Sequence, residues 1–236
     1  MENTLNLFGE IGCEITVAEV SERMREFNSQ LDPLEATLFS AGGSVFEGLA
    51  LYNILKAYKG PKKVKIIGLA ASMATYIMLA FDEIEIEDTA YLMIHNPRGG
   101  SYGDKNVLKK DIELMERLSE DMATAYAEKT GREKDEIIGL MDKETWLSAK
   151  EALDLGLVDS IAEAAINSLA ASVSIPEKYL KNAPASLKAV VLTKQQNQRE
   201  IIPMKTDILK ALALPDSVTD SDLLKAVTDL KAKLDT

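Results

Sequence analysis

Hydrophobic and polar positions in the first 160 residues follow two periods, one typical of strands and one typical of helices. Residues 5–11 alternate between apolar and polar, as a half-buried strand does. The same reasoning predicts further strands at 34–39, 64–69, 83–87, 91–94 and 157–159. Helical spacing predicts helices at 17–27, 45–58, 73–80, 104–130, 133–141 and 149–155. This alternation predicts an α/β layered fold with a mainly parallel sheet.

The pattern changes beyond Ala164, where alanine, serine, glutamine and scattered prolines replace the regular periods. Residues 1–163 carry 17 basic and 30 acidic side chains, whereas residues 164–236 carry 10 and 8. We therefore predict three parts: a globular domain at 1–163, a linker at 164–203 that is partly disordered or helical, and a helical tail at 204–236.

Composition excludes several classes of protein. The 236 residues are 46% hydrophobic, which is enough for a full core, and no apolar run approaches a membrane span. A net charge of −11 argues against nucleic acid as the main partner. The N-terminus lacks the pattern of a signal peptide, and the single cysteine, Cys13, excludes an internal disulfide. We expect a cytoplasmic protein in which Cys13 is a buried strand residue.

Candidate chemistry begins at Ser72, which stands among small residues where a predicted strand passes into a helix. A hydroxyl at such a turn lies next to the unpaired N–H groups that open the helix, and those groups can bind a developing negative charge. Packing at a helix start would explain the same pattern. We take Ser72 as a candidate nucleophile, with the N–H of Met73 as one oxyanion donor.

Three other elements are expected at the same edge, because the carboxyl ends of parallel strands lie together. Gly42 and Gly43 follow the second strand and let backbone N–H groups face a ligand. His95, the only histidine, closes a later strand and can take a serine proton at neutral pH. Asp142 and Glu144 are the candidate carboxylates to orient its ring.

Cofactors are not expected. One histidine and one cysteine leave too few typical ligands for a metal site. The chain has no phosphate-binding loop, so we expect no ATP site of its own.

Four segments, in order, resemble the Clp-type serine peptidase family, whose fold is related to the crotonase fold. Residues 40–52 are similar to its oxyanion loop and following helix, and 68–74 to its nucleophile segment. Residues 93–97, Met-Ile-His-Asn-Pro, resemble its histidine segment. Residues 146–159 resemble the stretch after its acidic residue. The resemblance covers residues 5–163 and implies an α/β fold of the Clp/crotonase ββα-unit type, with a helical C-terminal extension added.

The resemblance implies roles for particular residues. Ser72 would be the nucleophile and His95 the base, with the N–H groups of Gly43 and Met73 as oxyanion hole. Glu144 falls on the third triad position, where most of the family has aspartate, so Asp142 remains an alternative. Substrate-binding residues would be Gly42 and the segment Gly99, Gly100 and Ser101, which resembles the family's strand that pairs with extended substrate. Residues 104–130 would form the handle helix that joins rings.

The two ends depart from the core family and resemble its phage head-maturation branch. The start lies almost at the first strand, so docking of an unfoldase ATPase is doubtful, and the tail resembles scaffold sequence. The implied function is an ATP-independent serine endopeptidase that forms a homo-oligomeric ring and cleaves scaffold or capsid polypeptide, in the host cytoplasm or procapsid. The alternatives are a weak or inactive Clp-fold assembly protein, a general Clp proteolytic subunit, and a crotonase-like acyl-CoA enzyme. No nucleic acid or membrane partner is implied.

Overall fold

The computed structural model describes residues 3–27, 29–162 and 182–184. The predicted linker at 164–203 and tail at 204–236 therefore lie almost wholly outside the described residues. The strands are β1 (Asn3–Phe8), β2 (Leu34–Ser40), β3 (Lys62–Ala71), β4 (Glu83–Glu87), β5 (Tyr91–Ile94), β6 (Thr145–Ser148) and β7 (Ser160–Ala162). The helices are α1 (Val17–Arg25), α2 (Val45–Ala57), α3 (Met73–Met78), α4 (Lys105–Thr130), α5 (Lys134–Asp142) and α6 (Ala149–Leu155).

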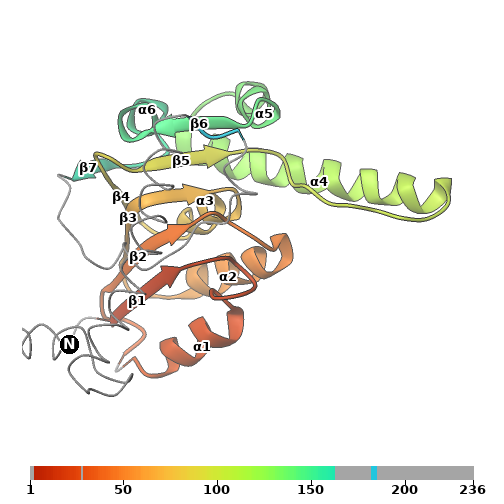
Figure 1. The fold of residues 1–236 in the computed structure, drawn as a ribbon. Coiled ribbons are helices and arrows are strands. Elements are labelled where there is room, and N and C mark those ends of the chain that lie inside the picture. Colours follow the sequence, from red (N-terminus) through yellow and green to blue (C-terminus); the bar gives the residue numbers. More distant parts are fainter. Residues whose placement is uncertain (1–2, 28, 163–181, 185–236) are drawn as a thin grey trace, which may run out of the picture. The chain divides into compact units, whose positions relative to one another are not determined.

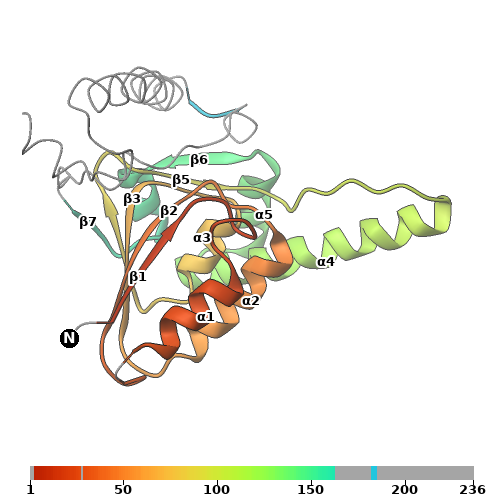
Figure 2. The ribbon, with the colours of Figure 1, turned by 60° about the horizontal axis from the view of Figure 1, so that its bottom comes forward.

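The strands form one mainly parallel sheet in the order β1-β2-β3-β4-β7, with β5 paired to β3 and β6 paired to β5 (Figure 1). Each pair is parallel except β5 with β6. Helices α1, α2 and α3 lie on one face of this sheet (Figure 2). Their apolar side chains and those of the inner strands form a continuous core. The predicted α/β architecture is thus observed.

Strand β3 is the longest strand and changes its partner along its length. Its first half pairs with β4, where Ile66 lies opposite Ile86. Its second half pairs with β5, where Ala71 lies opposite Met93. Because both strands run the same way, their carboxyl ends lie together. Ser72 and His95, each the first residue after its strand, are brought to the same place.

Helix α4 packs into the core through its second half. Asp104 caps its start by accepting hydrogen bonds from two backbone N–H groups, and Gly131, with a φ of 67°, ends it. Its buried residues, Met122, Ala123 and Tyr126, all belong to the last third of the helix. The first half extends beyond the sheet (Figure 1). It exposes apolar side chains, namely Val107, Leu108, Ile112 and Leu114.

Three details differ from the sequence predictions. The last strand begins at Ser160, after the predicted 157–159, because Leu157 and Val158 pack into the core beside α6 rather than joining the sheet. Strand β6, which pairs antiparallel with β5, is absent from the sequence prediction because its four residues show no alternation of buried and exposed positions. Cys13 is exposed in a turn, so its predicted burial in a strand is wrong. The strand ends earlier, at Phe8, and Gly9 and Gly12 at positive φ turn the chain.

Candidate active site

Ser72 occupies a strained turn between β3 and α3. Its φ of 56° and ψ of −128° lie in a region that non-glycine residues rarely adopt, and such strain persists only where the surroundings enforce it. The Ser72 N–H donates to the Met93 carbonyl of β5 at 2.8 Å. Thr75 donates through its backbone and its hydroxyl to the Ser72 carbonyl, at 3.0 and 2.6 Å. These bonds fix the backbone of Ser72 in the turn.

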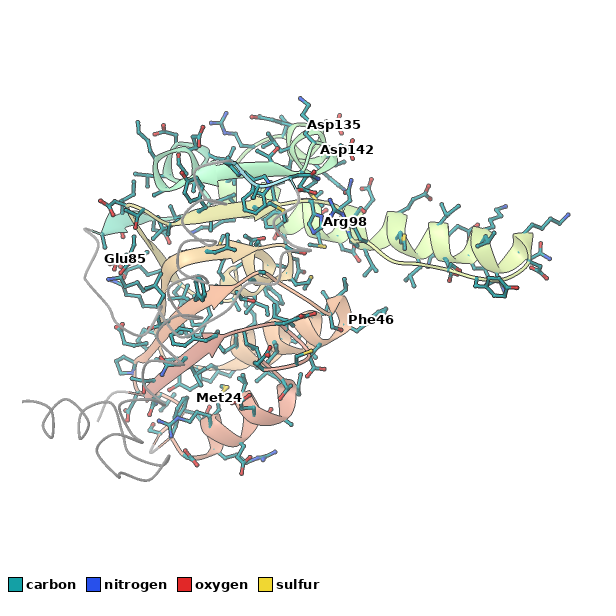
Figure 3. All side chains as sticks on the ribbon, viewed as in Figure 1. Met24, Phe46, Glu85, Arg98, Asp135 and Asp142 are labelled. Atoms are coloured by element: carbon teal, nitrogen blue, oxygen red, sulfur yellow. The ribbon has the colours of Figure 1, made fainter. Side chains whose placement is uncertain are left out.

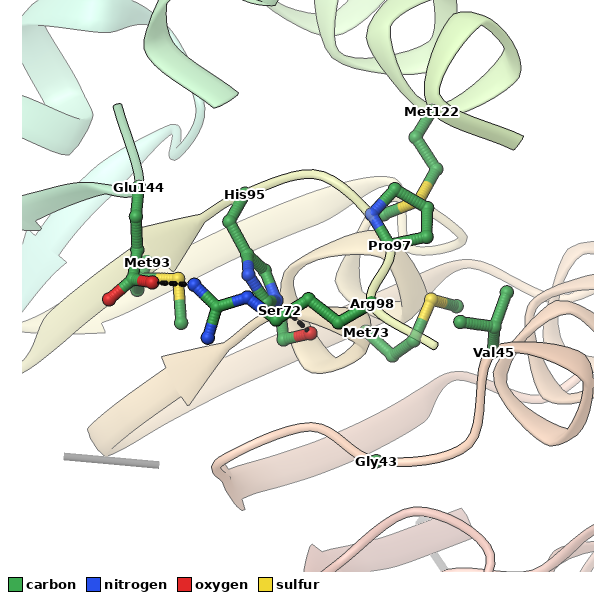
Figure 4. Close-up of a pocket in the computed structure, with 10 residues that line it drawn as sticks. All are labelled: Gly43, Val45, Ser72, Met73, Met93, His95, Pro97, Arg98, Met122 and Glu144. Carbon is green, nitrogen blue, oxygen red and sulfur yellow. Dashed lines mark hydrogen bonds and ion pairs between the residues drawn. The ribbon is translucent and has the colours of Figure 1, made fainter. Parts of the chain in front are cut away.

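The Ser72 hydroxyl lies 2.7 Å from Nε2 of His95, as the dashed line in Figure 4 marks. Serine and histidine are 23 positions apart in the sequence, and the β3–β5 pairing brings them together. Both line a pocket of about 320 Å³. Its other lining residues are Gly43, Val45, Met73, Met93, Pro97, Arg98, Met122 and Glu144. The sequence-predicted pair of nucleophile and base therefore has the geometry required for proton transfer.

Gly42 and Gly43 are placed beside this pair by two close backbone contacts. A Cβ on Gly42 would lie 2.6 Å from the Ala71 carbonyl oxygen and 2.7 Å from the Ser72 Cβ, and its φ is 92°. Gly43 forms a bridge with Ile11 that uses the Gly42 carbonyl and the Ser44 N–H. The Gly43 N–H takes no part in that bridge. Gly43 and Met73 both line the pocket, as the predicted oxyanion donors should.

Glu144 lines the pocket but does not bond to His95. Its carboxylate forms an ion pair with Arg98 and also accepts hydrogen bonds from Trp146 and Asn182. Asp142, the alternative, accepts a hydrogen bond of 2.6 Å from Asn96. The Nδ1 atom of His95 is buried, and no described residue bonds to it. Neither carboxylate orients the ring in this structure, so the third triad position stays a prediction.

The environment of His95 disfavours its charged form. Burial of the ring and, to a smaller extent, the positive charge of Arg98 lower its pKa from 6.5 to about 4. The ring is therefore neutral at physiological pH, which is the protonation state that a general base needs.

The predicted substrate-binding segment lies beyond the pocket. Gly99, Gly100 and Ser101 are exposed in the irregular chain that leads from His95 to α4, and none of them lines the pocket. They do not form a strand here, so the proposed pairing with substrate stays a prediction. Arg98, which precedes them, was missed by sequence reasoning. Its position three residues after the histidine was the available signal.

Arg98 and Asp142 lie at the edge of the sheet where the strands end, and Phe46 at the start of α2 projects from that edge (Figure 3).

Within the described part of the chain, no group of three or more histidine, cysteine or acidic side chains could hold a metal ion. No helix in that same part is long and apolar enough to cross a membrane.

A parallel α/β sheet with a paired serine and histidine at the carboxyl ends of its strands is an arrangement that serine hydrolases use. The family model for Clp protease matches residues 9–165, well over half of this chain. The chain belongs to the Clp protease family.

Curated relatives and solved structures agree with this assignment. The ATP-dependent Clp protease proteolytic subunit of Pleurastrum terricola is 34% identical over 131 residues, which are 52% of this chain and 64% of that protein. Subunit 1 of Salinibacter ruber is 29% identical over 151 residues, 63% of this chain and 64% of that protein. The chain thus spans slightly less than two thirds of the length of these relatives. A ClpP1 mutant from Listeria monocytogenes superposes with a TM-score of 0.62 at 30% identity, over 69% of this chain and 92% of that one. The predicted Clp-type α/β fold is confirmed.

Proposed function

We propose that this chain is a serine peptidase of the Clp type that hydrolyses polypeptides through an acyl-enzyme on Ser72. The observation that carries the proposal is the 2.7 Å contact between the Ser72 hydroxyl and Nε2 of a neutral His95. Membership of the Clp protease family supports it.

The chemistry follows from the positions of these groups. His95 takes the hydroxyl proton while the Ser72 oxygen attacks the peptide carbonyl carbon, and the resulting oxyanion is stabilised by the N–H groups of Gly43 and Met73. The imidazolium then gives its proton to the leaving amine, so that the C–N bond breaks. Water, deprotonated by His95, hydrolyses the acyl-enzyme and restores the serine. No step consumes nucleotide, so we propose that short peptides are cleaved without ATP.

A general Clp proteolytic subunit is the form of this proposal that the relatives' names support, because those reported above are all Clp proteolytic subunits. A phage head-maturation role is a narrower hypothesis. The features that suggest it include residues 164–236, nearly all of which lie outside the described residues. The general function is therefore the one we put forward, with polypeptide as substrate class.

We also propose that the chain works as a homo-oligomeric ring. The first half of α4 exposes Val107, Leu108, Ile112 and Leu114, and Ile112 is 57% exposed. An apolar helix face of this kind is a typical protein contact surface. Sedimentation of the purified chain would measure the assembly, and a monomer at micromolar concentration would contradict this part of the proposal.

The central test compares the parent with Ser72→Ala and, as a matched control, with Ser21→Ala on α1, outside the pocket. We expect Ser72→Ala to lose at least about 10³-fold in turnover of a fluorogenic peptide, because the acyl-enzyme cannot form. It should also lose labelling by a fluorophosphonate. Ser21→Ala should keep both. Parental turnover by Ser72→Ala would refute the proposal, and absence of labelling and turnover in the parent would favour the inactive assembly protein.

The same samples also test the head-maturation hypothesis and the crotonase-like alternative. Self-cleavage between residues 165 and 203 in the parent but not in Ser72→Ala would support head maturation. A fluorophosphonate adduct on Ser72 would exclude an acyl-CoA enzyme that has no nucleophilic serine.

A further inference from the structure

Both oxygens of the Glu144 carboxylate have partners other than His95. Arg98 Nη2 pairs with Oε2, and the Asn182 amide donates to the same oxygen at 3.2 Å. The Trp146 indole N–H donates to Oε1 at 3.3 Å. Figure 4 shows the Arg98 side chain reaching from the loop after Pro97 past His95 to Glu144. The carboxylate is thus engaged by three partners, none of which is His95.

His95, in turn, lacks a described hydrogen-bond partner at Nδ1. For Nε2 to accept the Ser72 proton, the ring must carry its own proton on Nδ1, and that atom is buried without a described partner. A buried donor without a hydrogen-bond partner destabilises the arrangement that contains it. The charged groups that face the ring are Arg98 from the following loop and Glu144 from the turn after α5. Asp142, the nearby acid on α5, is bonded to Asn96.

We propose that Arg98 is a positioning residue that holds Glu144 away from His95, and that release of this ion pair lets Glu144 accept the Nδ1 proton and completes the triad. The inference rests on the proposed function, since it concerns the same base. It is distinct from the catalytic roles of Ser72 and His95, because Arg98 acts through Glu144.

The exposures of the two partners favour such an exchange. The Glu144 side chain is 11% exposed and Arg98 is 63% exposed, so the arginine can move into solvent while the carboxylate stays in the pocket. An ion pair with an exposed partner typically contributes little net free energy, so little is lost when Glu144 exchanges Arg98 for another partner. Glu144 also has a φ of 50°, a strained value for a non-glycine residue, so its turn is held by its surroundings.

A change of the Glu144 partner from Arg98 to Nδ1 of His95 would alter the imidazole base in two ways. With Arg98 in place, its positive charge adds to burial and disfavours the imidazolium that must form during catalysis. With Glu144 on Nδ1, a carboxylate would stabilise that imidazolium and fix the ring in the tautomer that accepts from Ser72. Release of Arg98 should therefore raise turnover more than it changes substrate binding.

The test uses Arg98→Met, which keeps much of the side-chain length without charge, and Arg98→Lys, which keeps the charge. His95 is the single histidine, so ¹⁵N spectra of histidine-labelled full-length protein report its two ring nitrogens without overlap. We expect Arg98→Met to raise the imidazole pKa from about 4 and to increase kcat by about tenfold or more at similar KM. Arg98→Lys should resemble the parent.

Loss of the Arg98 charge would raise the imidazole pKa even if Glu144 did not move, so a double variant is decisive. In Arg98→Met with Glu144→Gln, the pKa and kcat gained by Arg98→Met should be largely lost. If the double variant keeps both gains, or if Arg98→Met changes neither, the positioning role is refuted. The spectra do not require activity. If Glu144→Gln reverses the rise in pKa in a protein without peptidase turnover, the proposed function is refuted while the positioning role of Arg98 is supported.

Discussion

The hydroxyl of Thr75 lies 2.7 Å from the phenol oxygen of Tyr126 and donates to the Ser72 carbonyl at 2.6 Å. Because the threonine proton is used in the second bond, the Tyr126 hydroxyl is the donor in the first. Tyr126 is fully buried on α4, and burial raises the pKa of its phenol far above the usual value, so it stays a donor at all accessible pH. The helix that extends from the domain is thereby tied to the turn that carries the candidate nucleophile.

Removing that hydroxyl should weaken both the fold and the turn. We expect Tyr126→Phe to lower the free energy of unfolding by about 0.5–1.5 kcal/mol, because the Thr75 oxygen loses its donor in a buried site. Chemical denaturation would measure this, and fluorophosphonate labelling of Ser72 should slow in parallel. Tyr102→Phe, at a fully exposed tyrosine, is the control and should change neither. Equal stability of the two variants would show that the buried contact contributes nothing.

Gly42 should tolerate no side chain. A Cβ there would meet the Ala71 oxygen and the Ser72 Cβ inside van der Waals distance, at a φ that L-residues rarely adopt. We expect Gly42→Ala to push the oxyanion loop from Ser72, with a loss in kcat of about 10²-fold, comparable to removal of one oxyanion donor. It should also destabilise the fold by about 1–3 kcal/mol.

The matched control for this substitution is Gly139→Ala. Gly139 lies within α5, and a Cβ at that position meets nothing within 4 Å. Alanine should stabilise this helix by about 0.5–1 kcal/mol without affecting peptide turnover. Parental activity in Gly42→Ala would contradict the oxyanion role of the loop.

The lowered pKa of His95 predicts the acid side of the pH profile. Because the folded imidazole has a pKa of about 4, kcat/KM should fall only as the pH approaches 4, rather than near the ordinary value of 6.5. Rates with a fluorogenic peptide between pH 3.5 and 8 would measure this, provided that the fold is monitored by circular dichroism. An acid limb centred near 6.5 would contradict the predicted pKa.

The same shift has a consequence for stability. Between about 4 and 6.5 the unfolded chain binds a proton at His95 and the folded chain does not, so this group makes the protein less stable as the pH falls through that window. The carboxylates also titrate there, so the difference between the parent and His95→Gln isolates the contribution. We expect the stability of the parent relative to His95→Gln to decrease from pH 7 to pH 4. A constant difference would contradict the linkage.

Local pattern was enough to predict most elements of this protein. Strands 83–87 and 91–94 and helix 149–155 match their predicted bounds, because the first alternates, the second is an apolar run between turns, and the helix is capped at both ends. Strand β6 was missed because four residues carry too little periodicity, and its pairing with β5 is a long-range contact. Cys13 was misplaced because a short apolar stretch does not reveal that glycines at 9 and 12 turn the chain.

The sequence by itself determined the order of elements and the candidate residues Ser72, His95, Gly42 and Gly43, because each stands at a strand end where a parallel sheet gathers its loops. The tertiary structure decided which of these groups touch. In the structure Ser72 contacts His95, and the Glu144 carboxylate pairs with Arg98, 46 positions earlier in the chain, rather than with the His95 ring. The physical reason is that the pattern of hydrophobic and polar residues reports local structure only. The partner of a carboxylate depends on which charged and polar groups the fold brings within contact distance, and these can lie far apart in the sequence.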